Sequence, residues 1–454
     1  MDELAALVDA GRKIAAALRG LGDDVEVFVL RTDAYPIEVH EDELRPEVRV
    51  GRVQVGMRLL RGGAMTLAST TSLDVDENVQ TLRAALSVSR PAALAEFSAV
   101  RTPLQDAIDP SLLPYAQDPA LVYDLARALR RRFREAPRAS LIESFDAACA
   151  LRLRWRAVVT ARGEGGAARG ALTSFADLDA THYDAVYRPV IDEGAVDALE
   201  HVGVRLLAEY PERDVTPEEL GVRGARVRAV IAPRLVEEIV RTVLQEKLLA
   251  SSVAAGNTHV RPGMRLLGEA FTLDSLGDDR ELGNCAPCDD EGTPTRRTRV
   301  IEGGTFRSFV SSRLSARRTG LPETGNGVRA PLFDEEPNEA LVRDRLAGLE
   351  MPAGTRTVHE LVASMERGVV LFSLLGLHGA DKARARFSAT ARGGFAVRDG
   401  KVIGRLSPGN WSISGGLLDD AAGPGIFAEV EPSRERVLTG TGRLPWLLAH
   451  AQVA

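Results

Sequence analysis

Three consecutive acids near the middle of the chain are the residues best suited by type to do chemistry. Asp289, Asp290 and Glu291 are followed at once by Gly292. Neighbouring carboxylates suit acid-base catalysis or metal binding. A tight turn in front of a strand is the alternative interpretation, because glycine favours turns. The residues alone leave both interpretations open.

Two arginine pairs follow the acids at a short distance. They are Arg296-Arg297 and Arg317-Arg318, and a turn at Gly325-Asn326-Gly327 comes after them. Arginine binds carboxylates through two parallel hydrogen bonds, so these pairs could hold the nearby acids or a peptide carboxylate. A structural ion network is the alternative. The turn alone predicts no phosphate site.

The histidines show no metal-binding spacing. The chain contains seven, none of them three, four or five residues from another. A zinc peptidase helix needs its ligands on one face and a glutamate to activate water. His359-Glu360 begins such a motif, but Ala363 and Ser364 follow where a second histidine would stand. We therefore expect His359 and Glu360 to form a pair on a helix surface.

Cys285-Ala286-Pro287-Cys288 has the spacing of a redox or metal pair. Cys149 is the remaining cysteine, and an odd count of three does not suggest a disulfide framework. Three interpretations stay open for the pair: loop cysteines without chemistry, a reversible disulfide, or a metal clip.

The elements that would position these residues follow from hydrophobic spacing and glycine turns. In the N-terminal half we expect helices at 4–18, from about 76, and at 120–134. We expect strands at 25–30, 36–40, 49–60 and 64–69, two paired strands broken near Cys149 over 139–160, and a strand from about 169. The segment 184–207 should be partly helical. In the C-terminal half we expect a helix at 234–249 and strands at 225–231, 298–302, 305–310, 393–398 and 401–406, the last two joined by an Asp399-Gly400 hairpin turn.

This order predicts an α+β protein with an antiparallel sheet in its N-terminal domain and a β-rich C-terminal domain. The polar segment 211–217 contains two prolines and is the expected boundary. We assign residues 1–210 to the first domain and 218–454 to the second.

Composition limits the classes of partner. The 454 residues carry a formal charge of -7, which gives no general attraction to nucleic-acid phosphates. The basic run Arg130-Arg131-Arg132 continues a helical pattern and is best explained as a solvated helix face. Acids at Asp2 and Glu3 stand where a secretory signal would carry bases, and no apolar run reaches membrane-spanning length. We expect a cytoplasmic protein without nucleic-acid or membrane partners.

The segments Asp289–Thr298, Ile301–Gly304, Leu314–Gly320 and Thr324–Asn326 closely resemble, in order and spacing, the TldD/PmbA family, metalloprotease-related proteins also called modulators of DNA gyrase. The resemblance extends over nearly the whole chain. It implies that such proteins act in pairs, in which a TldD-like subunit binds zinc through an H-E-x-x-x-H helix and a distant cysteine. The other subunit, TldE or PmbA-like, lacks these ligands.

Carried over without gaps, the zinc motif falls near Arg241, Thr242 and Glu246, and no cysteine follows Cys288. The resemblance therefore implies a metal-free, TldE/PmbA-like subunit without catalytic residues, while zinc would lie on a TldD-like partner in a heterodimer. The pair would hydrolyse small or unfolded peptides, bound in extended form along strand edges.

The substrate-binding residues that we assign through this resemblance are Asp290, Glu291, Arg296, Arg317 and Asn326. Two alternatives stay open for the function: a pair recruited to cleave an amide or C–N bond in natural-product biosynthesis, or an interaction module without a hydrolytic role.

Overall fold

A long antiparallel sheet forms the N-terminal half of the computed structural model, which describes residues 2–40, 43–92, 94–97, 99–100, 102–179, 182–329, 337–418 and 423–454. Its strands follow the order β5-β4-β3-β1-β7-β8-β6, and β2 and β9 pair with β1 and β8. The elements are α1 (Asp2–Leu18), β1 (Asp24–His40), β2 (Glu43–Pro46), β3 (Arg49–Arg61), β4 (Ala64–Thr70), α2 (Val75–Ala85), β5 (Arg90–Pro91), β6 (Gln105–Asp106), α3 (Leu113–Gln117), α4 (Ala120–Glu135), β7 (Phe145–Thr160), β8 (Gly163–Leu178), β9 (His182–Arg188), α5 (Glu193–Glu200) and α6 (Val204–Ala208).

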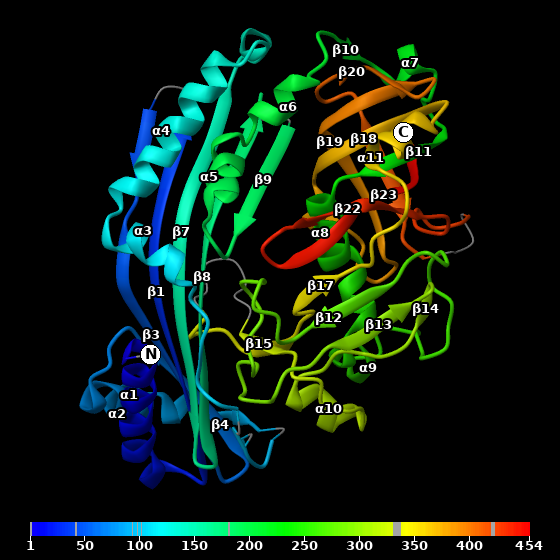
Figure 1. The fold of residues 1–454 in the computed structure, drawn as a ribbon. Helices are drawn as coiled ribbons and strands as arrows, with labels where there is room; N and C mark the ends of the chain where they lie inside the picture. Colours follow the sequence, from blue (N-terminus) through cyan, green and yellow to red (C-terminus); the bar gives the residue numbers. More distant parts are fainter. Residues whose placement is uncertain are drawn as a thin grey trace.

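The second sheet builds the C-terminal half and lies beside the first (Figure 1). Its order is β10-β20-β19-β18-β11-β23-β17-β12-β13-β14. The elements are β10 (Asp214–Val215), α7 (Pro217–Leu220), β11 (Arg226–Ile231), α8 (Pro233–Ile239), α9 (Ala250–Ala254), β12 (Leu273–Leu276), β13 (Thr298–Glu302), β14 (Thr305–Phe306), α10 (Arg313–Thr319), β15 (Gly327–Arg329), β16 (Val342–Asp344), β17 (Gly348–Glu350), α11 (Val358–Ala363), β18 (Arg367–Leu375), β19 (Arg386–Arg398), β20 (Lys401–Leu406), β21 (Ser412–Gly416), β22 (Glu431–Leu438) and β23 (Gly442–Val453).

Helices cover one face of the N-terminal sheet because each presents an apolar stripe to it. The buried side chains of α1 include Leu4, Leu7, Ile14 and Leu18. Their spacings of three, seven and four residues place them on one face of the helix. These side chains join the core formed by β1, β3 and β7. The opposite face of the same sheet, at strands β7, β8 and β9, points toward the C-terminal half (Figure 1).

The predicted α+β class is confirmed, and several elements have the predicted bounds. Strands β13 and β20 match the expected ranges, and the turn between β19 and β20 places Asp399 and Gly400 at φ of 50° and 74°, as a tight hairpin requires. Within the described residues no helix is long and apolar enough to cross a membrane.

Several expectations about the elements were wrong. The strand expected at 305–310 is β14, which covers only Thr305–Phe306. The two strands expected at 25–30 and 36–40 are one strand, β1, and the expected break near Cys149 is absent because β7 runs continuously from Phe145 to Thr160. Strand β8 begins at Gly163, six residues before the predicted start. The long pairing of β7 with both β1 and β8 holds these segments extended despite their weak local signal.

The helix expected at 234–249 changes its type twice. It starts as α8 at Pro233–Ile239, widens into a π turn at Val240–Leu244 and tightens into a 3₁₀ turn at Gln245–Leu248. A π turn inserted in a helix often marks a functional position. The domain boundary expected at 211–217 falls where the chain leaves the first sheet and enters the second through β10, and it stays a prediction.

Candidate functional site in the groove between the two sheets

Three adjoining cavities form a groove between the sheets. The first, about 480 Å³, lies between β9, the start of α8 and the β22–β23 hairpin. The second, about 520 Å³, shares Arg188, Arg436 and Leu438 with it, and the third, about 210 Å³, shares Tyr187. We call the residues that line these three cavities the inter-sheet groove.

The groove follows strand edges. In the described part of the chain β9 pairs with β8 alone, so its outer edge keeps backbone groups available to an added strand. The residues Arg436–Leu438 of β22 line the other wall. An extended peptide can bind such an edge through main-chain hydrogen bonds, which requires little sequence preference.

The end of the groove, the 210 Å³ cavity, is cationic. It is lined by Arg152 and Arg154 of β7, Arg169 of β8 and Tyr187 of β9 on one side, and by the loops at Gly283-Asn284 and Gly440-Thr441 on the other. Sequence analysis missed these residues. The alternating pattern Arg152-Leu-Arg154-Trp-Arg156 was the available signal, because alternate residues of a strand point to one face.

The acids Asp289, Asp290 and Glu291 lie in a buried ion network that links the two sheets. Asp290 and Glu291 are 4% and 1% exposed. Arg156 of β7 binds the Asp290 carboxylate, and the Arg58 guanidinium lies 3.4 Å from a Glu291 carboxylate oxygen. The backbone also forms the tight turn that was the alternative interpretation of this segment, since Gly292 has φ of 75°.

Electrostatics inside this network follow from burial and from charge pairing. Burial, and then the nearby Glu291, raise the pKa of Asp289 well above its ordinary value. Burial opposes ionisation of Glu26 on β1, yet Arg58 and Arg329 hold the pKa of that carboxyl below its ordinary value. The Arg58 guanidinium binds Glu26 at 2.7 and 2.6 Å, and Arg329 binds it at 2.8 Å. The network thus joins β1 and β3 to the segment around β15.

The structure brings together only some of the five residues assigned to substrate binding. Asn326 is 2% exposed and adjoins Gly327, whose carbonyl accepts a hydrogen bond of 2.9 Å from the Asp290 backbone. Arg296 donates instead to the Glu323 carbonyl at 2.7 Å. Arg317 contacts Glu96 at 3.5 Å.

Of the interpretations left open for the two arginine pairs, the structural ion network describes the contacts of Arg297 and Arg317. Arg297 pairs with Asp274 and Glu350, and the acids take their cations from Arg58 and Arg156. None of the five assigned residues lines the three cavities of the groove. Their role in substrate binding stays a prediction.

The position where a zinc motif would fall holds a different set of interactions. The Arg241 guanidinium binds Glu237 at 2.8 Å and donates to the carbonyls of Leu346, Ala347 and Thr441. Thr441 also donates its hydroxyl to Glu237. A guanidinium carries only donors and cannot ligate a cation.

The residues at this position therefore do not fit zinc. Across the described ranges, no group of three or more histidines, cysteines or acids is arranged to hold a metal ion. The Arg241–Glu237 pair instead connects the helix to the loop before β23.

The two neighbouring cysteines are free thiols, and both are buried. Burial raises the pKa of Cys285 to about 11, and its thiol donates to the Leu276 carbonyl at 3.1 Å. Thiolate is the reactive form of cysteine, so neither the redox nor the metal interpretation gains support from this arrangement.

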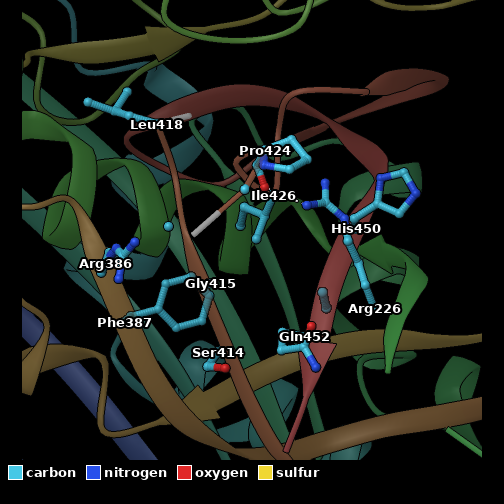
Figure 2. Close-up of a pocket in the computed structure, with 13 residues that line it drawn as sticks. Arg226, Arg386, Phe387, Ser414, Gly415, Leu418, Pro424, Ile426, His450 and Gln452 are labelled. Atoms are coloured by element: carbon cyan, nitrogen blue, oxygen red, sulfur yellow. Dashed lines mark hydrogen bonds between the residues drawn. The ribbon is translucent and has the colours of Figure 1, made fainter. Parts of the chain in front are cut away.

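A further cavity of about 270 Å³ lies within the C-terminal half (Figure 2), and it shares no lining residue with the inter-sheet groove. Its Arg226 side chain donates to the carbonyls of Pro424 and Gly425, so this cation is already engaged. The wall includes Gly415 and Gly416 of the glycine-rich strand β21. Residues 419–422 lie outside the described part of the chain.

Comparisons of the fold and of the sequence both find similarity to peptidase-related proteins built from two sheets. Residues 224–422 match the family description "PmbA/TldA metallopeptidase C-terminal domain". A TldE from Thermococcus kodakarensis has the same fold, with a TM-score of 0.79, 17% identity and coverage of 98% of this chain and 100% of that chain.

Sequence relatives agree with this class. A metalloprotease TldD homologue from Buchnera aphidicola is 24% identical over 141 residues, 31% of this chain and 28% of that protein. A zinc metalloprotease TldD homologue from Saccharolobus solfataricus is 25% identical over 190 residues, 42% of this chain and 41% of that protein. The matched part thus spans less than half the length of either relative. Residues 224–422 are therefore similar to the PmbA/TldA C-terminal domain, and the whole chain shares its fold with the Thermococcus kodakarensis TldE.

Proposed function

We propose that this chain is the metal-free subunit of a paired TldD/TldE-type peptidase and that it shapes the cavity in which a zinc-bearing partner hydrolyses small or unfolded peptides. The observation that carries the proposal is the Arg241–Glu237 pair, which stands where the resemblance would place zinc ligands. The names of the relatives support the peptidase class. The cytoplasmic location expected from the sequence belongs to the same proposal.

The inter-sheet groove supports the substrate class. A strand edge at β9 accepts main-chain hydrogen bonds from an extended peptide, whereas a folded protein does not present a free strand. The cavities of about 480 and 520 Å³ beside that edge have room for side chains of different sizes. We therefore expect the complex to accept peptides of many sequences but to require that the substrate be unfolded.

Metal analysis and a peptidase assay on two preparations test the proposal. The chain is purified alone and after co-expression with an H-E-x-x-x-H homologue from the same genome. We expect zinc and hydrolysis of an unfolded peptide only in the co-purified complex. A matched complex whose partner carries glutamine in place of the motif glutamate should retain assembly and lose hydrolysis. Stoichiometric zinc on the lone chain, or no association between the two chains, would overturn the proposal.

A further inference from the structure

Four arginines crowd one face of two neighbouring strands at the end of the inter-sheet groove. Arg152, Arg154 and Arg156 alternate along β7, and Arg169 of β8 lies directly opposite Arg154. Like charges directly opposite one another in a sheet are destabilising. The chain as a whole has a net charge of -7, so this concentration of positive charge is a local reversal.

Two of the four arginines are already neutralised and two are not. Arg156 binds the Asp290 carboxylate and donates to the Cys288 carbonyl at 2.7 Å. Arg169 donates to the Gln105 side-chain oxygen at 3.0 Å and lies 3.6 Å from Asp278. The side chains of Arg152 and Arg154, by contrast, form no hydrogen bond or ion pair with any residue that the structure describes.

The two unpaired arginines face the smallest of the three cavities. Both have exposed side chains, so a ligand in the groove can reach them. The surrounding protein, and then the charge of Arg152, lower the pKa of Arg154, which shows that its charge is poorly compensated. A bound anion would remove that cost.

Neutral groups complete the wall of the cavity. Burial, and then the nearby Cys285, raise the pKa of Tyr187, so its hydroxyl stays protonated and can donate a hydrogen bond. Gly440 has φ of 91°, and a Cβ at that position would lie 2.9 Å from the Tyr187 ring. Any larger residue there would press on the ring, so the wall is built to a close fit.

We propose that Arg152 and Arg154 bind the C-terminal carboxylate of an extended peptide that lies in the inter-sheet groove. A guanidinium matches a carboxylate through two parallel hydrogen bonds. The cavity of about 210 Å³ is less than half as large as the adjoining one of about 480 Å³, which suits the end of a chain better than its continuation. The peptide nature of the ligand rests on the proposed function, whereas its negative charge follows from the arginines alone.

Fluorescence anisotropy on the full chain, without a partner, tests this proposal. The probe is tetra-alanine with a neutral dye on its amino end, prepared once with a free C-terminus and once as the C-terminal amide. We expect the free acid to bind at least about ten-fold more tightly, and the R152Q/R154Q variant to lose that preference. R154K keeps the charge but not the two-pronged geometry, so it should keep only part of the preference.

R223Q is the matched control, because Arg223 lines none of the three cavities and is already paired with Glu218 on the surface. It should keep the full preference. Circular dichroism confirms that each variant is folded. An amide peptide that carries one internal glutamate and binds as well as the free acid would overturn the C-terminal assignment, and so would inorganic phosphate binding more tightly than the peptide.

Equal binding of acid and amide, or a preference that survives in R152Q/R154Q, would overturn the proposal as a whole. These results leave the co-purification experiment untouched, because they involve neither zinc nor a partner. Conversely, a failure of the chain to associate with a zinc-bearing homologue would not change the measured preference for a carboxylate. The two proposals therefore fail separately.

Discussion

At the scale of single residues, the Arg241–Glu237 ion pair occupies the position where the resemblance would place zinc ligands. The Glu237 and Arg241 side chains are 10% and 13% exposed, and the carboxylate also accepts hydrogen bonds from Thr439 and Thr441. Removing one partner of a buried ion pair leaves the other charge uncompensated, which costs more than the pair contributes.

We therefore expect Arg241→Met to lower the free energy of unfolding by roughly 3 kcal/mol, measured by urea denaturation. R223M is the control, since Arg223 pairs with Glu218 on the surface and both side chains are more than half exposed. Its effect should stay below about 1 kcal/mol. Equal stability of R241M and the unmodified chain would show that the pair is not an important connection between the helix and the loop before β23.

Some residue-scale predictions could not have been made from sequence alone. Glu291 takes its cation from Arg58, 233 positions earlier in the chain. Arginines lie much closer to it in sequence, at 296 and 317, and local spacing gives no reason to prefer the distant one. Burial and pairing across two sheets decide the partner, so the sequence could suggest an ion network around these acids but not its partners.

At the scale of elements, β9 contacts both halves of the molecule. It pairs with β8, and its first residue, His182, stacks on Phe395 of β19 with ring centroids 5.5 Å apart. Burial lowers the pKa of His182 from 6.5 to about 4. The neutral imidazole is therefore the form that this contact accommodates.

Stability should consequently depend on pH through His182. Between pH 6.5 and about 4 the unfolded chain binds a proton at this histidine and the folded chain does not. The free energy of unfolding is therefore highest above pH 6.5 and decreases as pH falls, by roughly 3 kcal/mol for this group.

Denaturant titrations from pH 7.5 to 4.5 measure this effect. His182→Gln removes the titrating group and should flatten the dependence on pH, although it lowers stability at neutral pH by disturbing the aromatic contact. His359→Gln, at an exposed position on α11, should leave the dependence unchanged. A slope that is the same in H182Q and the unmodified chain would contradict the assignment to His182.

Elements differ in how well the sequence predicts them. Asp399-Gly400 specifies a hairpin by backbone conformation, so β19 and β20 were placed correctly at the turn. By contrast, the run Ala147-Ala148-Cys149 has weak strand propensity, and only pairing on both sides keeps β7 extended there. The π turn after Ile239 likewise depends on contacts made by distant segments, such as those of Arg241.

At the scale of the whole molecule, Glu26 connects the two halves. It is fully buried, and it binds Arg58 of the N-terminal sheet together with Arg329 of the C-terminal half. The side chain of Arg329 is 1% exposed. Two buried guanidiniums therefore share the Glu26 carboxylate, and Arg58 also lies 3.4 Å from Glu291.

Glu26→Gln should accordingly destabilise the protein by roughly 3 kcal/mol and make the two halves unfold less cooperatively. Calorimetry checks both effects at once. Glu47→Gln is the matched control, since Glu47 pairs with Arg49 on the surface, and its effect should be within about 0.5 kcal/mol. A single sharp transition at an unchanged temperature in E26Q would contradict this role.

The place of β23 in the second sheet has a consequence for how the protein is made. This strand, formed by residues 442–453, lies between β11 and β17 and also pairs with β21 and β22. Synthesis proceeds from the N-terminus, so the first sheet can form while the ribosome is still adding the second half. Until the residues of β23 leave the exit tunnel, β11 and β17 expose unpaired edges. The interval before that point is when the nascent chain is most vulnerable to aggregation, and when a chaperone would protect it most.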